Sequence, residues 1–197
     1  MKNRKTREAI VSAADTLFYE RGFEATSFAD IAAAVEISRG NFYYHFKTKD
    51  EILSAVIAKR IEDRRAMLAK WGEALAPRDR ILRFIEILIT NQSKIMTFGC
   101  PVGTLATELS KLAHPAQPDA NQIFSVFRDW LRLQFEELGC GGRSDDLAMH
   151  LLMRSQGIAT LAAAYKDEAF IRREAADMTG WLQSQLDPSK ASPRPSH

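Results

Sequence analysis

The sequence predicts an all-α protein with nine helices, and three observations carry that prediction. Capping residues recur along the chain ahead of apolar residues spaced three and four positions apart. No stretch sustains the alternation of apolar and polar residues that marks a strand. Of the 197 residues, 46% are hydrophobic and 26% charged, which is typical of a globular chain, and no apolar run approaches the roughly 18 residues that a membrane span needs.

The first three predicted helices are closely spaced, and two of them are short. Thr6 can cap a helix that ends at Gly22, Ser27 can open the second helix with Asp30 at its third position, and Ser38 can open the third. Helices of about two turns bury little surface alone, so we expect the second and third to form a helix-turn-helix braced by the first. Its small inner face would be Ile31, Val35, Ile37 and Phe42.

Six further helices follow. Thr48 to Glu51 forms a capping box ahead of the fourth helix, and Pro77 and Pro101 each suit the first turn of a helix, over 77–97 and 101–112. The last three are expected at 118–138, 144–165 and about 167–186. The final residues, 187–197, contain three prolines and three serines, so we expect a disordered tail.

Charge and cysteine content indicate the compartment in which the protein works. The net charge is only +2, and Lys2, Arg4, Lys5 and Arg7 form a basic arm that can approach phosphates but is equally an ordinary solubilising terminus. Two cysteines, Cys100 and Cys140, are too few for a disulfide framework, and no apolar segment follows the basic start as in a secretory signal. We therefore expect a reduced, cytoplasmic protein with no membrane partner.

The segment Thr26–Leu53 resembles the TetR/AcrR family of bacterial transcriptional repressors. The motifs that carry the resemblance are Thr26, Ile31-Ala32, Ser38-Arg39-Gly40, Tyr43-Tyr44-His45-Phe46 and Lys49 to Leu53. The resemblance implies a nine-helix architecture with a helix-turn-helix DNA-binding domain at residues 1–49 and an effector-binding and dimerisation domain at 50–186. One departure is Glu36, where the family often has glycine. If this position is left-handed, the side chain costs roughly 1–2 kcal/mol.

The third helix carries the residues expected to contact DNA. Its N-terminus can point at the major groove, where an arginine such as Arg39 can bond guanine O6 and N7 together, and Asn41 can pair with adenine. Gly40 would allow close approach to base edges, whereas Phe42 and Phe46 are expected in the core. The other expected contacts, mainly to phosphate, are Thr26, Ser27, Ser38, Tyr43, Tyr44, His45 and Lys49. The alternatives are a solvated surface Arg39 and a structural role for His45.

The remaining helices suggest a regulatory domain. The helices at 77–97 and 118–138 are apolar almost all round, so they could wall a cavity for an apolar or aromatic effector or form a solid core. The candidate pocket residues are Phe84, Leu88, Cys100, Phe127, Trp130, Met153 and Gln156. The helices at about 144–165 and 168–186 are expected to form a homodimer, because two recognition helices about 34–36 Å apart can read a palindromic operator on double-stranded DNA.

Cys100 supports a second hypothesis about regulation. The sequence around it resembles a branch of the family that includes repressors sensing electrophiles or oxidants. The thiol just ahead of Pro101 would feel the positive end of a helix, which favours thiolate, while apolar burial would act the other way. The alternative is an inert cysteine that fits the turn.

Other function classes find little support. His45, His114, His150 and His197 are scattered, and no glycine-rich phosphate loop follows a strand, so we expect no metal site, no cofactor and no catalysis. An RNA-binding or architectural DNA-binding protein would bind without sequence preference. An activator of the same fold is a variation within the main interpretation.

Overall fold

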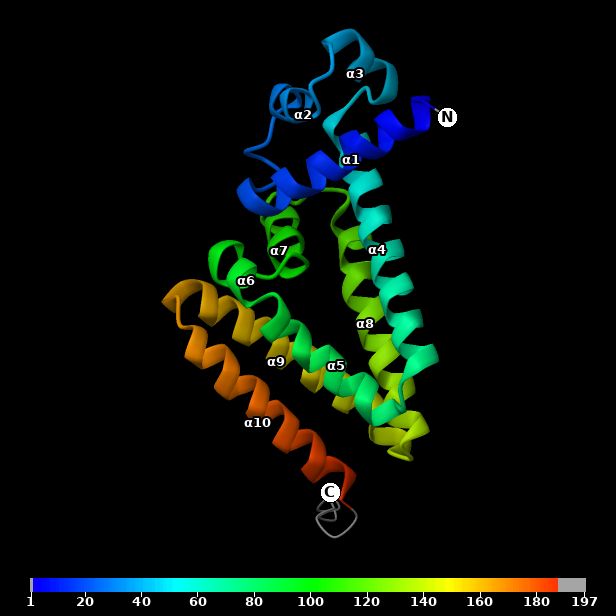
Figure 1. Ribbon diagram of the computed structural model, residues 1–197, viewed down its shortest axis with the longest axis vertical. Coiled ribbons are helices and arrows are strands. Elements are labelled where there is room, and N and C mark those ends of the chain that lie inside the picture. The colour runs from blue at the N-terminus through cyan, green and yellow to red at the C-terminus, as the bar shows by residue number, and fades with distance from the viewer. Residues whose placement is uncertain (1, 188–197) are drawn as a thin grey trace. The chain divides into compact units, whose positions relative to one another are not determined.

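The computed structural model describes residues 2–187, and within them the chain is helical with no strand (Figure 1). The all-α prediction is confirmed. Each segment predicted to be helical contains a helix, although some bounds differ, and residues 188–197 of the predicted tail, 187–197, lie outside the described residues. Packing divides the chain into two compact units, which are residues 1–67 with 100–126, and residues 68–99 with 127 onward. Two of the three boundaries therefore fall inside the long helices α4 (Lys49–Ala74) and α8 (Gln117–Glu137), and the third lies between Gly99 and Cys100.

The first unit is built around the N-terminal helices. It contains α1 (Lys2–Arg21), α2 (Phe28–Val35), α3 (Arg39–His45), most of α4, α7 (Gly103–Lys111) and the start of α8. Their side chains share one core, whose fully buried members include Ile10, Ile31, Phe42, Phe46, Ile52, Leu53 and Leu109. Helix α7 thus packs with the N-terminal helices, although about 60 residues of chain separate it from α3.

The joint between α2 and α3 has the left-handed geometry suspected from the sequence. Glu36 follows α2 with φ 56° and ψ 40°, and its backbone N–H donates to the carbonyls at the end of that helix. Glycine adopts this conformation at no steric cost, so Glu36 carries strain of roughly 1–2 kcal/mol. Two of the predicted caps are confirmed, whereas Thr6, predicted to cap the first helix, lies inside α1 because that helix begins at Lys2. Ser27 forms a capping box with Asp30, and Ser38 accepts the N–H of Asn41.

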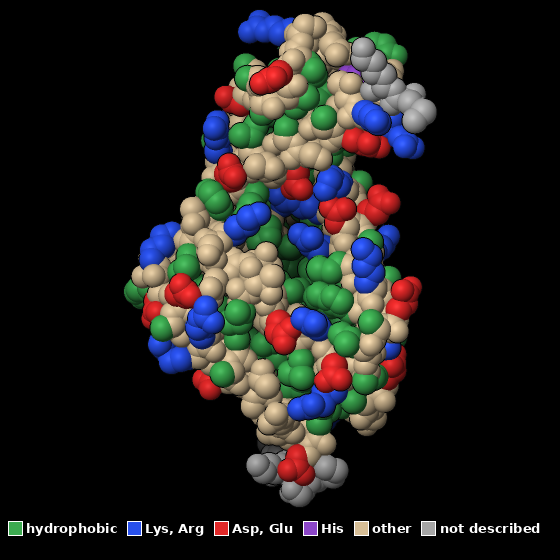
Figure 2. All heavy atoms as spheres, in the orientation of Figure 1, with side chains coloured by type: hydrophobic (Ala, Val, Ile, Leu, Met, Phe, Trp, Pro, Cys, Tyr) green, Lys and Arg blue, Asp and Glu red, His purple; other side chains and the backbone are tan. Residues whose placement is uncertain are grey.

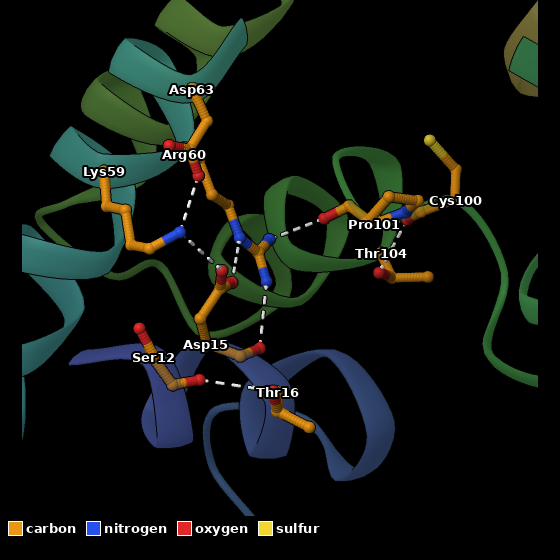
Figure 3. Close-up of polar contacts among 9 residues, drawn as sticks. All are labelled: Ser12, Asp15, Thr16, Lys59, Arg60, Asp63, Cys100, Pro101 and Thr104. Carbon is orange, nitrogen blue, oxygen red and sulfur yellow. Dashed lines mark hydrogen bonds and ion pairs between the residues drawn. The ribbon is translucent and has the colours of Figure 1, made fainter. Parts of the chain in front are cut away.

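A buried ion pair fixes α1 to α4 (Figure 3). The guanidinium of Arg60, only 3% exposed, donates from Nε to the carboxylate of Asp15 at 2.6 Å and from Nη1 to the carbonyl of Pro101 at 2.6 Å. Lys59 Nζ also lies 4.0 Å from Asp15. Arg60 therefore joins α1, α4 and the turn ahead of α7 in one polar network.

The second unit contains the later helices. These are α5 (Pro77–Thr90), α6 (Gln92–Phe98), the rest of α8, a short 3-10 helix (Gly141–Arg143), α9 (Ser144–Tyr165) and α10 (Glu168–Leu186). Helix α10 packs against α5 and α9, and α6 packs against α9. At the end of α4, Arg80 donates to the carbonyls of Gly72 and Leu75, both at 2.7 Å, and to Gln134 of α8 at 2.9 Å.

Two predicted helices differ in detail. The segment 77–97 is interrupted at Asn91, whose φ of −106° and ψ of 13° leave the helical region and whose side-chain amide donates to the carbonyl of Ile87. The helix predicted from Pro101 begins at Gly103, because Pro101 and Val102 lie in a turn. The backbone N–H and the hydroxyl of Thr104 both donate to the carbonyl of Cys100, at 2.9 and 2.8 Å.

Candidate DNA-binding interface

Helix α3 presents polar and aromatic side chains on one side and anchors itself in the core on the other. Phe42 and Phe46 are buried, whereas Ser38, Arg39, Gly40 and Asn41 are exposed. Tyr43 and Tyr44 are 46% and 67% exposed, so much of each aromatic side chain faces outward. A Cβ at Gly40 would meet no atom within 4 Å, so the start of the helix is open to close approach.

The N-terminal turn of α1 lies against the end of α3. Asn3 Nδ2 donates to the hydroxyl oxygen of Tyr44 at 3.2 Å, and the guanidinium of Arg7 lies 4.8 Å from the centre of the Phe46 ring. Because the Tyr44 oxygen accepts this bond, its own proton is free to be donated outward. The ring of His45 packs edge-on against that of Tyr44 at 5.3 Å. The outer surface of the first unit therefore combines α3 with the basic start of α1.

Lys47 and Asn3 belong to this surface but are absent from the predicted site. Lys47 is exposed directly after α3, and its ammonium donates to the carbonyl of Tyr43. Its charge and its place next to the recognition helix are visible in the sequence. The contact between Asn3 and Tyr44 spans 41 residues and has no local signal.

Two predicted phosphate contacts are corrected by the structure. Thr26 is only 1% exposed, and its hydroxyl donates to the carbonyl of Gly22 at 2.7 Å. The Lys49 ammonium donates to the carbonyls of Phe23 and Glu24 at 3.0 and 3.3 Å and lies 4.3 Å from the centre of the Phe23 ring. Both side chains hold the turn between α1 and α2. Ser27 is exposed, but its hydroxyl is engaged with Asp30.

Charge on the visible surface is mixed. Figure 2 shows Lys and Arg side chains standing beside Asp and Glu side chains over most of the face drawn, with no single large patch of one sign. This agrees with the net charge of +2. Attraction to phosphate therefore depends on local groups such as those on α1 and α3 rather than on the overall charge.

The predicted effector residues fall into different places. Phe84, Leu88 and Phe127 are buried in the second unit, where the rings of Phe84 and Phe127 lie 5.6 Å apart. Trp130 and Gln156 are half-buried. The ring of Trp130 packs against that of Trp71, with 5.9 Å between the ring centres, and Trp71 is not among the predicted residues. Met153 is 59% exposed on α9, so it is not a lining residue of an interior pocket, and we correct that prediction.

Cys100 is a free, half-buried cysteine of the first unit. In Figure 3 its sulfur points away from Arg60 and Pro101. Burial, followed by the negative charge of a Cys100 thiolate, raises the pKa of the Tyr19 phenol to about 12, which places the two side chains within electrostatic reach. Cys140 is also free, and burial raises the pKa of its thiol.

Comparison with known proteins shows which family has this sequence and fold. Residues 10–56 match the family described as bacterial regulatory proteins, tetR family. The structure of a TetR transcriptional regulator from Legionella pneumophila superposes with a TM-score of 0.78 and 26% identity, covering 88% of this chain and 95% of that one. The chain belongs to the TetR family. The relatives and solved structures that match it are described as transcriptional regulators of the helix-turn-helix type or of the TetR family.

TetR-family relatives resemble the chain over only part of their length. An uncharacterized HTH-type transcriptional regulator of Lactococcus lactis is 30% identical over 62% of this chain and 64% of that protein. The HTH-type transcriptional repressor DhaR of a Mycobacterium species is 27% identical over 67% and 65%. Reduced NemR of Escherichia coli, 19% identical with a TM-score of 0.80, covers 89% of this chain and 96% of that one and shows the shared fold.

Two further findings concern membrane-spanning helices and metal sites. Between residues 2 and 187 no helix is long and apolar enough to cross a membrane. Over the same residues, no three His, Cys, Asp or Glu side chains gather in a way that could hold a metal ion.

Proposed function

We propose that this protein is a transcriptional repressor that binds a palindromic operator as a homodimer in the cytoplasm and is released by a small apolar or aromatic effector. The observation that carries the proposal is the surface of α3, where Arg39, Asn41, Tyr43 and Tyr44 are exposed on a helix whose other side is fixed in the core. Tyr43 packs against Phe28 and Tyr44 accepts a hydrogen bond from Asn3, yet the two tyrosines remain 46% and 67% exposed and can contact a partner.

Arg39 is the base-reading residue in this proposal. It stands at the first position of α3, where a helix in the major groove brings its side chains to base edges. Asn41 is a second base contact, and Gly40 permits close approach. Tyr43, Tyr44 and His45 donate to phosphate at the other end of the helix, and Ser38 positions the helix N-terminus by capping it.

The dimer is proposed to form through α9 and α10, because α9 carries an exposed apolar stripe. Met149, Met153, Leu161 and Tyr165 follow one another at spacings of four and eight residues, so they lie on one side of the helix, and they are 42–77% exposed. Gly157 fills the gap in the series, and a Cβ there would meet nothing within 4 Å. A stripe of this kind is typical of a helix that packs against a second copy.

An effector would act by linkage. The aromatic side chains Phe84, Phe127, Trp71 and Trp130 of the second unit are the groups that suit an apolar or aromatic ligand. A ligand lowers operator affinity only by binding one conformation of the dimer better, and a 100-fold decrease requires about 2.7 kcal/mol of coupling.

Selection of DNA fragments from a random duplex pool tests the proposal. We expect the recovered fragments to share a palindrome whose half-sites are centred about one helical turn apart. We also expect the protein to block transcription from a promoter that contains this palindrome, as the name of the repressor DhaR suggests for that relative. Recovery of unrelated sequences at the frequency of the starting pool would contradict sequence-specific binding and favour an architectural protein.

The half-exposed thiol of Cys100 supports a second mode of release, by an electrophile. In this mode Cys100→Ser leaves operator binding intact and abolishes release by an alkylating agent, while Cys140→Ser, the matched control, is released as the parent is. Equal release of the Cys100→Ser variant and the parent would exclude this mode.

A further inference from the structure

The turn between α1 and α2 has its backbone polar groups held by three side chains. Gly22 takes a φ of +94° and its carbonyl accepts the hydroxyl of Thr26 at 2.7 Å. The carbonyls of Phe23 and Glu24 accept the Lys49 ammonium. The N–H groups of Phe23 and Glu24 remain, and a residue far along the chain accepts both.

That residue is Glu108 of α7. Its Oε2 accepts the N–H of Phe23 at 2.9 Å and its Oε1 accepts the N–H of Glu24 at 2.9 Å, across 85 and 84 residues of sequence. Hydrogen bonds from backbone N–H groups to a carboxylate are among the stronger ones in proteins. The carboxylate is packed so closely that a Cβ at Gly22 would lie 2.9 Å from Oε1.

Glu108 is held on a rigid support. Its neighbours Leu105 and Leu109 on α7 are 2% and 0% exposed and belong to the core that α1, α2 and α3 share. On the other side, the turn leads directly into Ser27, the N-cap of α2. The position of the turn therefore sets where α2 begins, and the joint at Glu36 passes that position on to α3.

We propose that Glu108 is a positioning residue for DNA recognition, which fixes the orientation of α2 and α3 by holding the α1–α2 turn from α7. The inference rests on the proposed sequence-specific DNA binding. It adds a residue outside the helix-turn-helix segment to those that determine specificity.

The variant Glu108→Gln tests the proposal, because a pure charge effect and a loss of positioning would change the affinity for the operator in opposite directions. It is nearly isosteric, keeps one acceptor oxygen, and removes one negative charge. Charge alone would strengthen binding to DNA. Loss of positioning would weaken binding to the operator and spare non-specific duplex. The matched control is Glu62→Gln, which removes the same charge from an exposed position of α4 in the same unit.

The measurement is the ratio of affinities for the selected operator and for a scrambled duplex at one salt concentration. We expect the ratio to fall on the order of tenfold in Glu108→Gln, the size of one lost hydrogen bond to a charged group, and to stay at the parent value in Glu62→Gln. A merely structural role would lower the active fraction and leave the ratio unchanged. An unchanged or increased ratio in folded Glu108→Gln would overturn the inference.

Two further measurements keep the test decisive. Amide hydrogen exchange at Phe23 and Glu24 should quicken in Glu108→Gln, and unaltered exchange would contradict the contact itself. If that variant does not fold, Lys49→Met loosens the turn from the α4 side and should lower the ratio in the same way, whereas a parent ratio would overturn the inference. A parent chain that prefers no duplex would instead overturn the proposed function.

Discussion

At the scale of single residues, α3 separates its side chains by role. Phe42 and Phe46 hold it in the core, and Arg39 stands where a base edge would pass. Arg39→Lys should lose about 1–3 kcal/mol of discrimination at one operator position while non-specific binding stays near the parent value, because lysine keeps the charge but cannot bond guanine at two points. Competition binding against operators with single-base changes measures this, and retained preference at every position would contradict a base contact.

Tyr44 is expected to act differently from Arg39. Its hydroxyl accepts from Asn3 and can donate its proton to phosphate, so Tyr44→Phe should weaken operator and scrambled duplex by the same factor. The same titrations measure it. A change of discrimination without loss of non-specific binding would show that Tyr44 reads bases.

Glu36 is strained by its left-handed backbone, with φ 56°. Glu36→Gly should raise the free energy of unfolding by about 1 kcal/mol, because glycine removes the steric cost, partly offset by its greater freedom in the unfolded chain. Urea denaturation of the chain measures it. The control Ala33→Gly, inside α2, should lower stability by about 1 kcal/mol, and a loss of stability in both variants would contradict the strain at Glu36.

At the scale of elements, sequence patterns predicted the helices well and the partners of their side chains poorly. Capping by Ser27 and Ser38 involves residues three positions apart, so the sequence predicts it correctly. The sequence shows only the neighbours of Thr26 and Lys49 along the chain, whereas both side chains donate to carbonyls of the turn between α1 and α2. Glu108 was missed because its contacts lie 84 and 85 residues away.

Two further differences have the same kind of cause. The break at Asn91 interrupts an apolar pattern that continues on both sides of it, so periodicity alone cannot reveal it. Met153 lies on a helix that has apolar residues on several sides, and sequence cannot distinguish those that face the interior from those that face a second copy.

The exposed stripe of α9 makes a prediction about assembly. Leu161→Glu should weaken the dimer at least about tenfold, because the two-fold axis buries the added charge twice. Leu133→Glu is the matched control, since Leu133 of α8 is also 46% exposed but stands outside the stripe. Sedimentation at several protein concentrations measures both. A dimer unaffected by Leu161→Glu would contradict the proposed face.

We expect His150 of α9, which packs against α10, to make the stability of the fold depend on pH. Its ring stacks on Trp181 at 4.3 Å, and burial, followed by the charge of Arg154, lowers the pKa of His150 below the ordinary value of about 6.5. The unfolded chain therefore binds this proton more readily, and stability is lost as pH falls through about 6.5 towards the lower folded value.

The variant His150→Phe should flatten that part of the stability profile while it keeps the stacked ring. Thermal unfolding at fixed protein concentration between pH 8 and pH 5 measures this, with His45→Phe as the control. An equally steep profile in His150→Phe would show that other groups cause the dependence.

At the scale of the whole molecule, the proposed regulation involves two compact units, and both α4 and α8 run from one unit into the other. The first unit contains α7 as well as the helix-turn-helix, so the part of the chain that we propose recognises DNA extends beyond its first 50 residues. Effector binding in the second unit can alter operator affinity only through a difference in free energy between conformations of the dimer.

The most direct test of the central claim is amide hydrogen exchange of the full chain with and without its selected operator duplex. We predict that protection on binding concentrates in residues 38–47, with a smaller effect at the start of α1, and that scrambled duplex at the same salt concentration gives little. Protection confined to other helices, or none at α3 under conditions of full binding, would contradict the account.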